Sequence, residues 1–235
     1  MNSSELIESR NALIFLRDGT PVWLRPILAQ DKAEIARAFE RLSPQSRYHR
    51  FFGPVRELSP QTLAYLTEID YVNHFAWGAF ALAEADAPLV GEARYVRLRD
   101  EPQCAEIAVA VIDEYHRRGL GLQLLRALTE VAVEKGIRRF VGHALRENHP
   151  ILRLLRGAKA QIVPERSGVL RFAVDLAAIC EEFAWAPWKA KGGVMFAHGL
   201  DDAGDSARDG RTIVSSSRSR MAVGSLQRPV CAGDV

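Results

Sequence analysis

Residues 105–135 read AEIAVAVIDEYHRRGLGLQLLRALTEVAVEK. Residues 107–112 form an apolar run that favours a buried strand, and leucine and valine then recur at helical spacing over residues 120–132. Between the two, Gly119 and Gly121 let the backbone pass close to a ligand, beside the free N–H groups of a helix N-terminus. The stretch therefore predicts a strand, a turn that holds a phosphate by its backbone, and a helix. A turn whose glycines serve packing alone is the alternative.

The same stretch resembles the coenzyme site of the GNAT superfamily of acyl-CoA N-acyltransferases. The family's pyrophosphate loop follows the pattern Gln/Arg-x-x-Gly-x-Gly/Ala, and the matching residues here are His116, Arg117, Arg118, Gly119, Leu120 and Gly121. His116 stands where the family has Gln or Arg. The resemblance implies acetyl-CoA as co-substrate, with main-chain contacts from Val109, Ala110 and Val111 to its pantetheine arm. Asn148 is similar to an asparagine that contacts the coenzyme in the family, and it is equally suited to cap the helix that follows it.

The composition indicates a globular, enzyme-sized chain. Its 235 residues are 48% hydrophobic, which is enough to bury a core, and the formal net charge is only +2. This near balance gives no electrostatic case for nucleic acid or an acidic membrane surface as a partner, and no apolar run is long enough to span a bilayer. The three cysteines and six histidines show neither disulfide nor metal-ligand spacing, and no apolar signal opens the chain. We expect a cytoplasmic protein without a metal.

Hydrophobic patterning predicts one α/β domain over residues 21–185. The expected order is strand, two helices, three strands, helix, strand, helix and two strands, over residues 22–24, 31–42, 59–70, 74–83, 89–98, 107–112, 120–135, 138–144, 148–156, 161–163 and 169–174. Residues 43–52 are expected to be a basic, aromatic connector. This order matches the GNAT fold, which implies a central mixed, mostly antiparallel sheet with flanking helices. The resemblance also implies that the central strands on either side of the coenzyme loop splay apart.

Residues 176–185 are predicted to be the last helix of this domain. The two ends of the chain are expected to lie outside it, and residues 1–20 are predicted to be an N-terminal extension. Residues 186–235 are predicted to be a disordered tail, because residues 201–235 are rich in Gly, Ser, Arg and Asp and lack hydrophobic periodicity. A tail that binds a partner through its alternating charges is the alternative.

Four short segments narrow the resemblance to the catalytic domains of bacterial Pat-type protein lysine acetyltransferases. They are LRPI at residues 24–27, LSPQSRYHRFF at 42–52, LTEIDY at 66–71 and AEIA at 105–108. The resemblance implies a protein lysine as the acceptor. Within the second segment, Arg47, Tyr48, His49 and Arg50 are candidates for the acceptor lip or, equally, for a helix-packing corner.

Glu106 is the candidate general base. An amine attacks a thioester only in its neutral form, which is about a thousandfold under-populated at pH 7 for a lysine of pKa near 10.4, so a proton acceptor is needed. Strict alternation places Glu106 on one strand face with Ala108 and Ala110, whose small side chains leave space beside a carboxylate. In Pat-type enzymes a glutamate at this Ala-Glu-x-Ala position is the assigned base. A solvated strand-end carboxylate or a salt-bridge partner is the alternative.

The predicted function is transfer of an acetyl group from acetyl-CoA directly to a primary amine, most plainly a protein lysine. A main-chain N–H near Val109 is expected to polarise the thioester carbonyl. Leu155 occupies the position at which many GNAT enzymes place a tyrosine acid, so the thiolate is expected to leave unaided or with water. A small-molecule amine acetyltransferase and a non-catalytic acyl-CoA-binding module are the alternatives.

Overall fold

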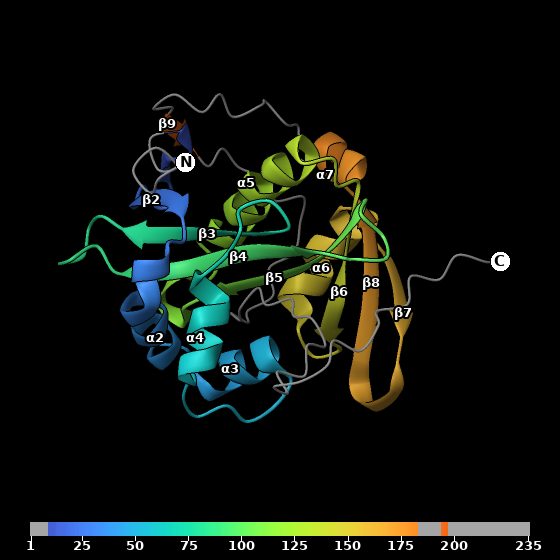
Figure 1. Ribbon diagram of the computed structural model, residues 1–235, viewed down its shortest axis with the longest axis horizontal. Coiled ribbons are helices and arrows are strands. Elements are labelled where there is room, and N and C mark those ends of the chain that lie inside the picture. The colour runs from blue at the N-terminus through green and yellow to red at the C-terminus, as the bar shows by residue number, and fades with distance from the viewer. Residues whose placement is uncertain (1–8, 183–193, 197–235) are drawn as a thin grey trace.

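The computed structural model describes residues 9–182 and 194–196. Within these residues the strands form one mixed sheet in the order β7-β8-β6-β5-β4-β3-β2-β1-β9 (Figure 1). The strands are β1 Ala12–Phe15, β2 Pro21–Pro26, β3 His74–Ala81, β4 Leu89–Arg97, β5 Cys104–Val111, β6 Arg139–Leu145, β7 Gln161–Pro164, β8 Val169–Asp175 and β9 Val194–Phe196. Only the β5–β6 and β1–β9 pairs are parallel among the described strands. The predicted α/β fold with a mixed, mostly antiparallel sheet is confirmed.

Helices cover both faces of this sheet. They are α2 Lys32–Glu40, α3 Pro44–Phe51, α4 Pro60–Thr67, α5 Leu120–Glu134, α6 His149–Gly157 and α7 Leu176–Glu182. In Figure 1, α2, α3 and α4 lie on one side of the sheet, whereas α5 and α7 lie on the other. The order of helices and strands from β2 to α7 follows the prediction except in residues 43–52.

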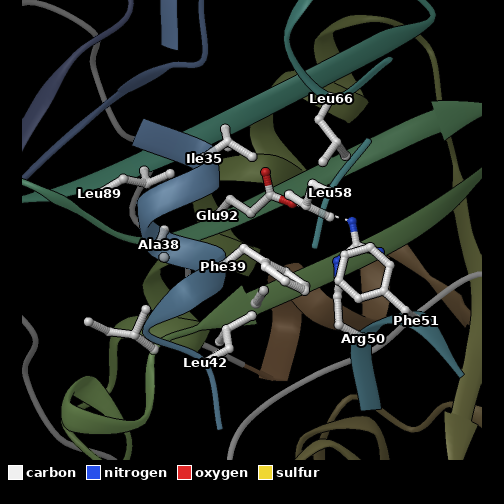
Figure 2. A pocket seen from close by; sticks show the side chains of 13 residues that line it. Ile35, Ala38, Phe39, Leu42, Arg50, Phe51, Leu58, Leu66, Leu89 and Glu92 are labelled. Carbon is white, nitrogen blue, oxygen red and sulfur yellow. Dashed lines mark hydrogen bonds and ion pairs between the residues drawn. The ribbon is translucent and has the colours of Figure 1, made fainter. Parts of the chain in front are cut away.

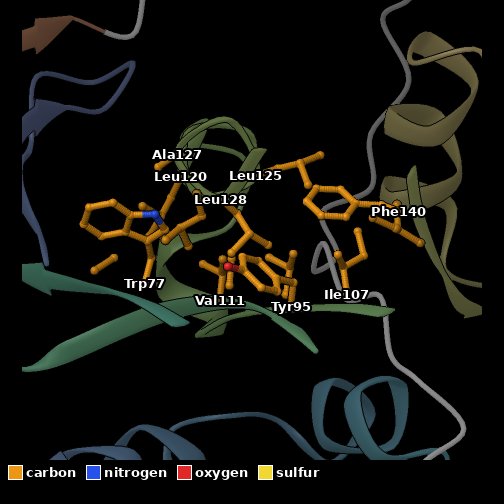
Figure 3. Packing of buried hydrophobic residues seen from close by; sticks show 14 of the residues in the cluster. Trp77, Tyr95, Ile107, Val111, Leu120, Leu125, Ala127, Leu128 and Phe140 are labelled. Atoms are coloured by element: carbon orange, nitrogen blue, oxygen red, sulfur yellow. The ribbon is translucent and has the colours of Figure 1, made fainter. Parts of the chain in front are cut away.

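Alternate side chains of β5 divide the interior between these two faces. Ile107 and Val111 point toward α5 and pack with Leu125 and Leu128, as Figure 3 shows. Leu128 is fully buried, and each such leucine stabilises the fold by about 1.5–3 kcal/mol. Because side chains alternate along a strand, Glu106, Ala108 and Ala110 face the α2–α4 side. The pairing of β5 with β4 runs from Ala105 to Val111 without a register shift, so the predicted placement of the glutamate with the two alanines on one face is confirmed.

The prediction of a connector at residues 43–52 is wrong, because these residues form helix α3. Ser43 caps the helix by accepting a hydrogen bond from the Ser46 amide at 3.2 Å, and Pro44 occupies its first turn. The helix ends at Phe52, which adopts a left-handed conformation with φ of 53°. Ser43 also donates through its amide and its hydroxyl to Asp113, both at 2.8 Å. Contacts with the turn after β5 therefore stabilise a helix whose own sequence is mostly polar.

The sheet extends beyond the expected domain limits at both ends. Strand β1 lies within the expected N-terminal extension and pairs antiparallel with β2. Its alternate residues Ala12 and Ile14 are buried in the core, which stabilises the strand in this position. Strand β9 lies within the expected tail and pairs parallel with β1. The last helix α7 is described to Glu182, and residues 183–193 and 197–235 of the predicted helix end and tail lie outside the described residues.

Asp31 lies directly before helix α2, and its carboxylate binds back toward strand β2. It accepts hydrogen bonds from the Leu28 amide at 2.7 Å and from both terminal nitrogens of Arg25 at 2.7 and 2.8 Å. Helix α2 starts one residue later without a side-chain cap. The carboxylate therefore ties β2 to the turn that follows it.

Candidate active site

Strands β5 and β6 separate in the middle of the sheet. They pair only where Cys104, Ala105 and Glu106 face residues 139–141, although β5 continues to Val111 and β6 continues to Leu145. Beyond Glu106 no further β5–β6 pair forms, and the opening is our name for this unpaired interval between the two parallel strands. The expected splay of the central strand pair is therefore present, and Glu106 is the last paired residue of β5.

The polar main-chain groups of alternate β5 residues face this opening. At one end of β5 the Cys104 carbonyl accepts from Leu98, and just past the other end the Ile112 amide donates to Val90, so even-numbered residues bond toward β4. By alternation, the amide and carbonyl of Val109 point toward β6, beyond the paired segment. The expected main-chain contact of Ala110 with the pantetheine arm does not fit this arrangement, because the amide and carbonyl of Ala110 point toward β4. Only the methyl group of Ala110 can contact a ligand, on the sheet face that α3 covers.

The turn before α5 has the backbone geometry of an anion site. Arg117 and Gly119 both adopt positive φ, of 62° and 88°, and Gly119 is the residue before the first turn of α5. The first main-chain bond of α5 runs from the Gln123 amide to the Gly119 carbonyl. The amides before Gln123, including those of Leu120 and Gly121, therefore have no partner within the helix and point from its positive end. A phosphate group fits this end of the helix.

The side chains of this turn differ in how freely they can reach an anion at the N-terminus of α5. The His116 ring is turned inward, with Nε2 2.8 Å from the Val111 carbonyl oxygen and only 8% of the side chain exposed. Burial lowers the pKa of His116 below its ordinary value, with the Val111 carbonyl opposing. Arg118 lies over the Tyr115 ring and 3.4 Å from the Asp18 carboxylate. Arg117 is exposed, so of these three side chains it alone is unrestrained toward a phosphate.

The Glu106 carboxylate lies in a cluster assembled from three other segments. Its Oε1 is 3.7 Å from Nδ1 of His143 on β6, and Nε2 of the same ring is 3.7 Å from Oε1 of Glu165, which lies between β7 and β8. The Nε of Arg171 on β8 is 3.9 Å from the same Glu165 oxygen. Glu106 and His143 are 17% and 14% exposed. A carboxylate at the edge of the opening is thus placed where it can accept a proton.

Comparison with known proteins agrees with this geometry. The sequence model of the acetyltransferase (GNAT) family matches residues 44–158, from α3 through the turn before α5 to the end of α6. This part of the chain is a GNAT acetyltransferase domain. The assignment supports acyl transfer over a non-catalytic binding module.

Two curated proteins and one solved structure show where the similarity lies. Acetyltransferase PA5475 from Pseudomonas aeruginosa is 37% identical over 124 residues, which cover 53% of this chain and 66% of that protein. Acetyltransferase Pat from Mycolicibacterium smegmatis is 33% identical over 162 residues, covering 68% of this chain and 47% of that protein. The crystal structure of the GNAT domain of S. lividans PAT matches with a TM-score of 0.64 at 29% identity, covering 70% of this chain and 96% of that one. The chain thus spans no more than about two thirds of the first curated relative and about half of the second.

In the GNAT domain, Asn148 caps helix α6. Its side-chain oxygen accepts a hydrogen bond from the Ile151 amide at 3.4 Å, and the residue is 1% exposed. The capping role is confirmed, and a contact with the coenzyme stays a prediction. Among the described residues no group of His, Cys, Asp or Glu side chains is arranged to hold a metal ion, and none of the described helices could cross a bilayer.

A second buried charge cluster lies on the α2–α4 face of the GNAT domain. Glu92 on β4 binds Arg94 at 2.5 and 3.2 Å and Arg50 of α3 at 3.3 Å. Burial alone would raise the pKa of Glu92, but Arg94 and Arg50 outweigh it and lower that pKa to about 2. Burial, with Arg94, lowers the pKa of His74 to about 3. Glu92 is therefore ionised and His74 neutral at pH 7.

A small cavity of about 40 Å³ adjoins this cluster. Figure 2 shows Arg50 and Glu92 at its polar side and Phe39, Leu42 and Phe51 around the remainder. The cavity reaches β5 at Ala110, four residues from Glu106, which is about 13 Å along an extended strand. The cavity therefore lies apart from the Glu106 carboxylate. Arg50 is buried in packing and ion pairing, so the helix-corner interpretation of this residue agrees with the structure.

Sequence patterns missed several residues around the site. His143 and Glu165 had no spacing signal because pairing of β6, β8 and β7 brings them to Glu106. Tyr65 of α4 is a further neighbour: burial raises its pKa, Glu106 and Glu92 add to this effect, and Arg94 and Arg50 oppose it. The side chain of Arg17, from the β1–β2 turn, lies beside Gly119, 3.5 Å from where a Cβ would stand. Only a three-dimensional arrangement reveals these neighbours.

Proposed function

We propose that this protein transfers the acetyl group of acetyl-CoA to the side-chain amine of a protein lysine, with Glu106 as general base. The observation that carries the proposal is the position of Glu106, the last β5 residue paired with β6, on the face opposite α5 and at the edge of the opening between the strands. The similarity to Acetyltransferase Pat and to the GNAT domain of S. lividans PAT favours a protein acceptor.

The proposed coenzyme position follows the free main-chain groups. The pyrophosphate lies at the N-terminus of α5, against the amides of Gly119, Leu120 and Gly121, and Arg117 adds positive charge. The pantetheine arm enters between β5 and β6, where it replaces the missing strand pairing with bonds to Val109 and Val111. Asn148 lies at the start of α6, the helix that follows β6, and is proposed to contact the arm from that side.

In the proposed reaction the protein supplies a general base and a hydrogen-bond donor to the thioester carbonyl. Glu106 takes a proton from the acceptor ammonium, which leaves the amine lone pair free to attack the thioester carbon. The Val109 amide donates a hydrogen bond to the carbonyl oxygen as negative charge develops there. The attacking nitrogen loses its second proton to water, the carbon–sulfur bond breaks, and the thiolate leaves without a dedicated acid, because a thiol of pKa near 8.5 is a tolerable leaving group.

The test is incorporation of labelled acetyl groups into protein. The purified chain is incubated with radiolabelled acetyl-CoA and a cell lysate, with the Glu106→Gln variant as the matched control, and labelled sites are located by mass spectrometry. We expect acetyl-lysine in folded proteins with the wild type only. Label that enters only free small amines would contradict the protein-lysine assignment, and label that enters protein equally with the variant would remove Glu106 from the mechanism.

A further inference from the structure

His143 lies between two carboxylates and has no part in the reaction proposed above. Its Nδ1 is 3.7 Å from Glu106 and its Nε2 is 3.7 Å from Glu165. The ring is on the same sheet face as Glu106, because Val141, two residues before it on β6, is the register partner of Glu106. The imidazole therefore connects the inner carboxylate to the outer one.

The Nδ1 atom that faces Glu106 is buried and makes no hydrogen bond within the described part of the chain. Buried polar atoms almost always have a partner, and an exception calls for an explanation such as a role in catalysis. The gap to Glu106 is an ion-pair distance, slightly longer than a hydrogen bond, so a small rotation of either side chain closes it. The arrangement fits a contact that is made and broken during turnover.

Of the two carboxylates on either side of His143, the outer one is the more exposed. Glu106 is 17% exposed, whereas Glu165 is 27% exposed and has Arg171 3.9 Å from its Oε1. With an acceptor and acetyl-CoA bound at the opening, direct exchange of a proton between Glu106 and solvent is hindered further. Glu165 still reaches water from the segment before β8.

We propose that His143 is a positioning residue that acts through Glu106, accepting the proton of its carboxyl group at Nδ1 and passing a proton on from Nε2 toward Glu165 and solvent. The inference rests on the proposed function, since it takes Glu106 as the base. The acceptor ammonium gives one proton to Glu106, Nδ1 of a ring that carries its proton on Nε2 then takes it, and the Nε2 proton leaves toward Glu165 and water. Proton exchange with water returns the ring to its starting tautomer before the next turnover. Only N–H and O–H bonds form and break, and Glu106 returns to the carboxylate form.

The test compares variants of His143 in the full chain, with whichever amine acceptor the wild type acetylates. His143→Asn keeps a donor near the Nδ1 position but cannot carry a proton through the ring. His143→Ala leaves space for an added azole. The matched control is His149→Asn, the same substitution at an exposed residue. Melting temperature and acetyl-CoA affinity are measured for each variant, so that misfolding is detected separately.

We expect kcat to fall roughly 10- to 100-fold in both His143 variants. This is the range of losses seen in metalloenzymes when a residue that orients a metal ligand is replaced. Added imidazole is expected to restore part of the activity of His143→Ala, whereas pyrazole, of the same shape but a much weaker base, is expected to restore none.

Two results would overturn the inference: wild-type kcat in His143→Asn, or equal rescue of His143→Ala by pyrazole and imidazole. The Glu106→Gln variant is measured in the same assay. An inactive Glu106→Gln with a fully active His143→Asn would leave the proposed base in place and remove only the role of His143. A fully active Glu106→Gln would instead remove the base itself.

Discussion

Replacing Glu92 by glutamine is predicted to destabilise the fold by about 3–5 kcal/mol. The substitution keeps the side-chain shape but leaves Arg50 and Arg94, both buried, without their carboxylate partner. Breaking one side of a buried ion pair costs about 3–5 kcal/mol. The pKa of Glu92 gives a similar value: its fall from 4.5 to about 2 corresponds to about 3 kcal/mol at 1.36 kcal/mol per unit.

The same pKa shift fixes how this loss depends on pH. Because the folded-state pKa of Glu92 lies below its unfolded value, its contribution to stability is complete above pH 4.5 and disappears as pH falls toward 2. The difference in unfolding free energy between wild type and Glu92→Gln should therefore be constant from pH 7 down to about 5. Near pH 3 this difference in unfolding free energy should fall to about half of its value at pH 7.

Urea denaturation at pH 7 and pH 3 measures this difference. The matched control is Glu68→Gln, whose partner Lys32 is 43% exposed and whose own side chain is 55% exposed; an exposed pair contributes about 0–1 kcal/mol. The reasoning would be refuted if Glu92→Gln lowered the unfolding free energy by no more than Glu68→Gln does. It would also be refuted if the decrease in Glu92→Gln were the same at pH 7 and pH 3.

Two glycine substitutions test the packing of β6 against β8 and the proposed phosphate site at the turn before α5. Gly142→Ala places a Cβ 2.7 Å from the Phe172 ring and should cost about 1–3 kcal/mol of stability, while Gly157→Ala, with nothing within 4 Å, is the neutral control in the same thermal melts; equal melting temperatures would disprove the close packing. Gly121→Glu puts a negative charge in the first turn of α5 and should weaken acetyl-CoA binding by more than about 1.4 kcal/mol, or tenfold. Unchanged affinity by calorimetry would contradict the phosphate assignment.

The central strand, turn and helix could be predicted because their signals are local. The apolar run, the glycines and the helical spacing all lie within 31 residues, from residue 105 to residue 135. Helix α3 was missed because its own residues are polar and aromatic, and its start depends on Asp113, far along the chain. Strands β1 and β9 are short, and β9 exists through pairing with a segment near the opposite end of the chain.

The same contrast applies to the site. Glu106 and Val109 could be named from strand alternation and family resemblance, since both properties are read along one segment. The orientation of Ala110 and the inward turn of His116 depend on which neighbour each strand or ring meets, and sequence spacing carries no such information. His143 and Glu165 reach Glu106 only through the pairing of β6 with β8 and of β8 with β7.

The kinetics of Glu106→Gln test the central claim most directly. The substitution keeps the size and hydrogen bonding of the side chain but removes the base. We predict that kcat at pH 7 falls by roughly 10²–10⁴-fold, that the Kd for acetyl-CoA stays the same, and that raising the pH restores part of the rate because more acceptor amine arrives neutral. A variant that acetylates its acceptor at the wild-type rate at pH 7, or one whose defect is independent of pH and accompanied by a lower melting temperature, would contradict the assignment of Glu106 as the general base.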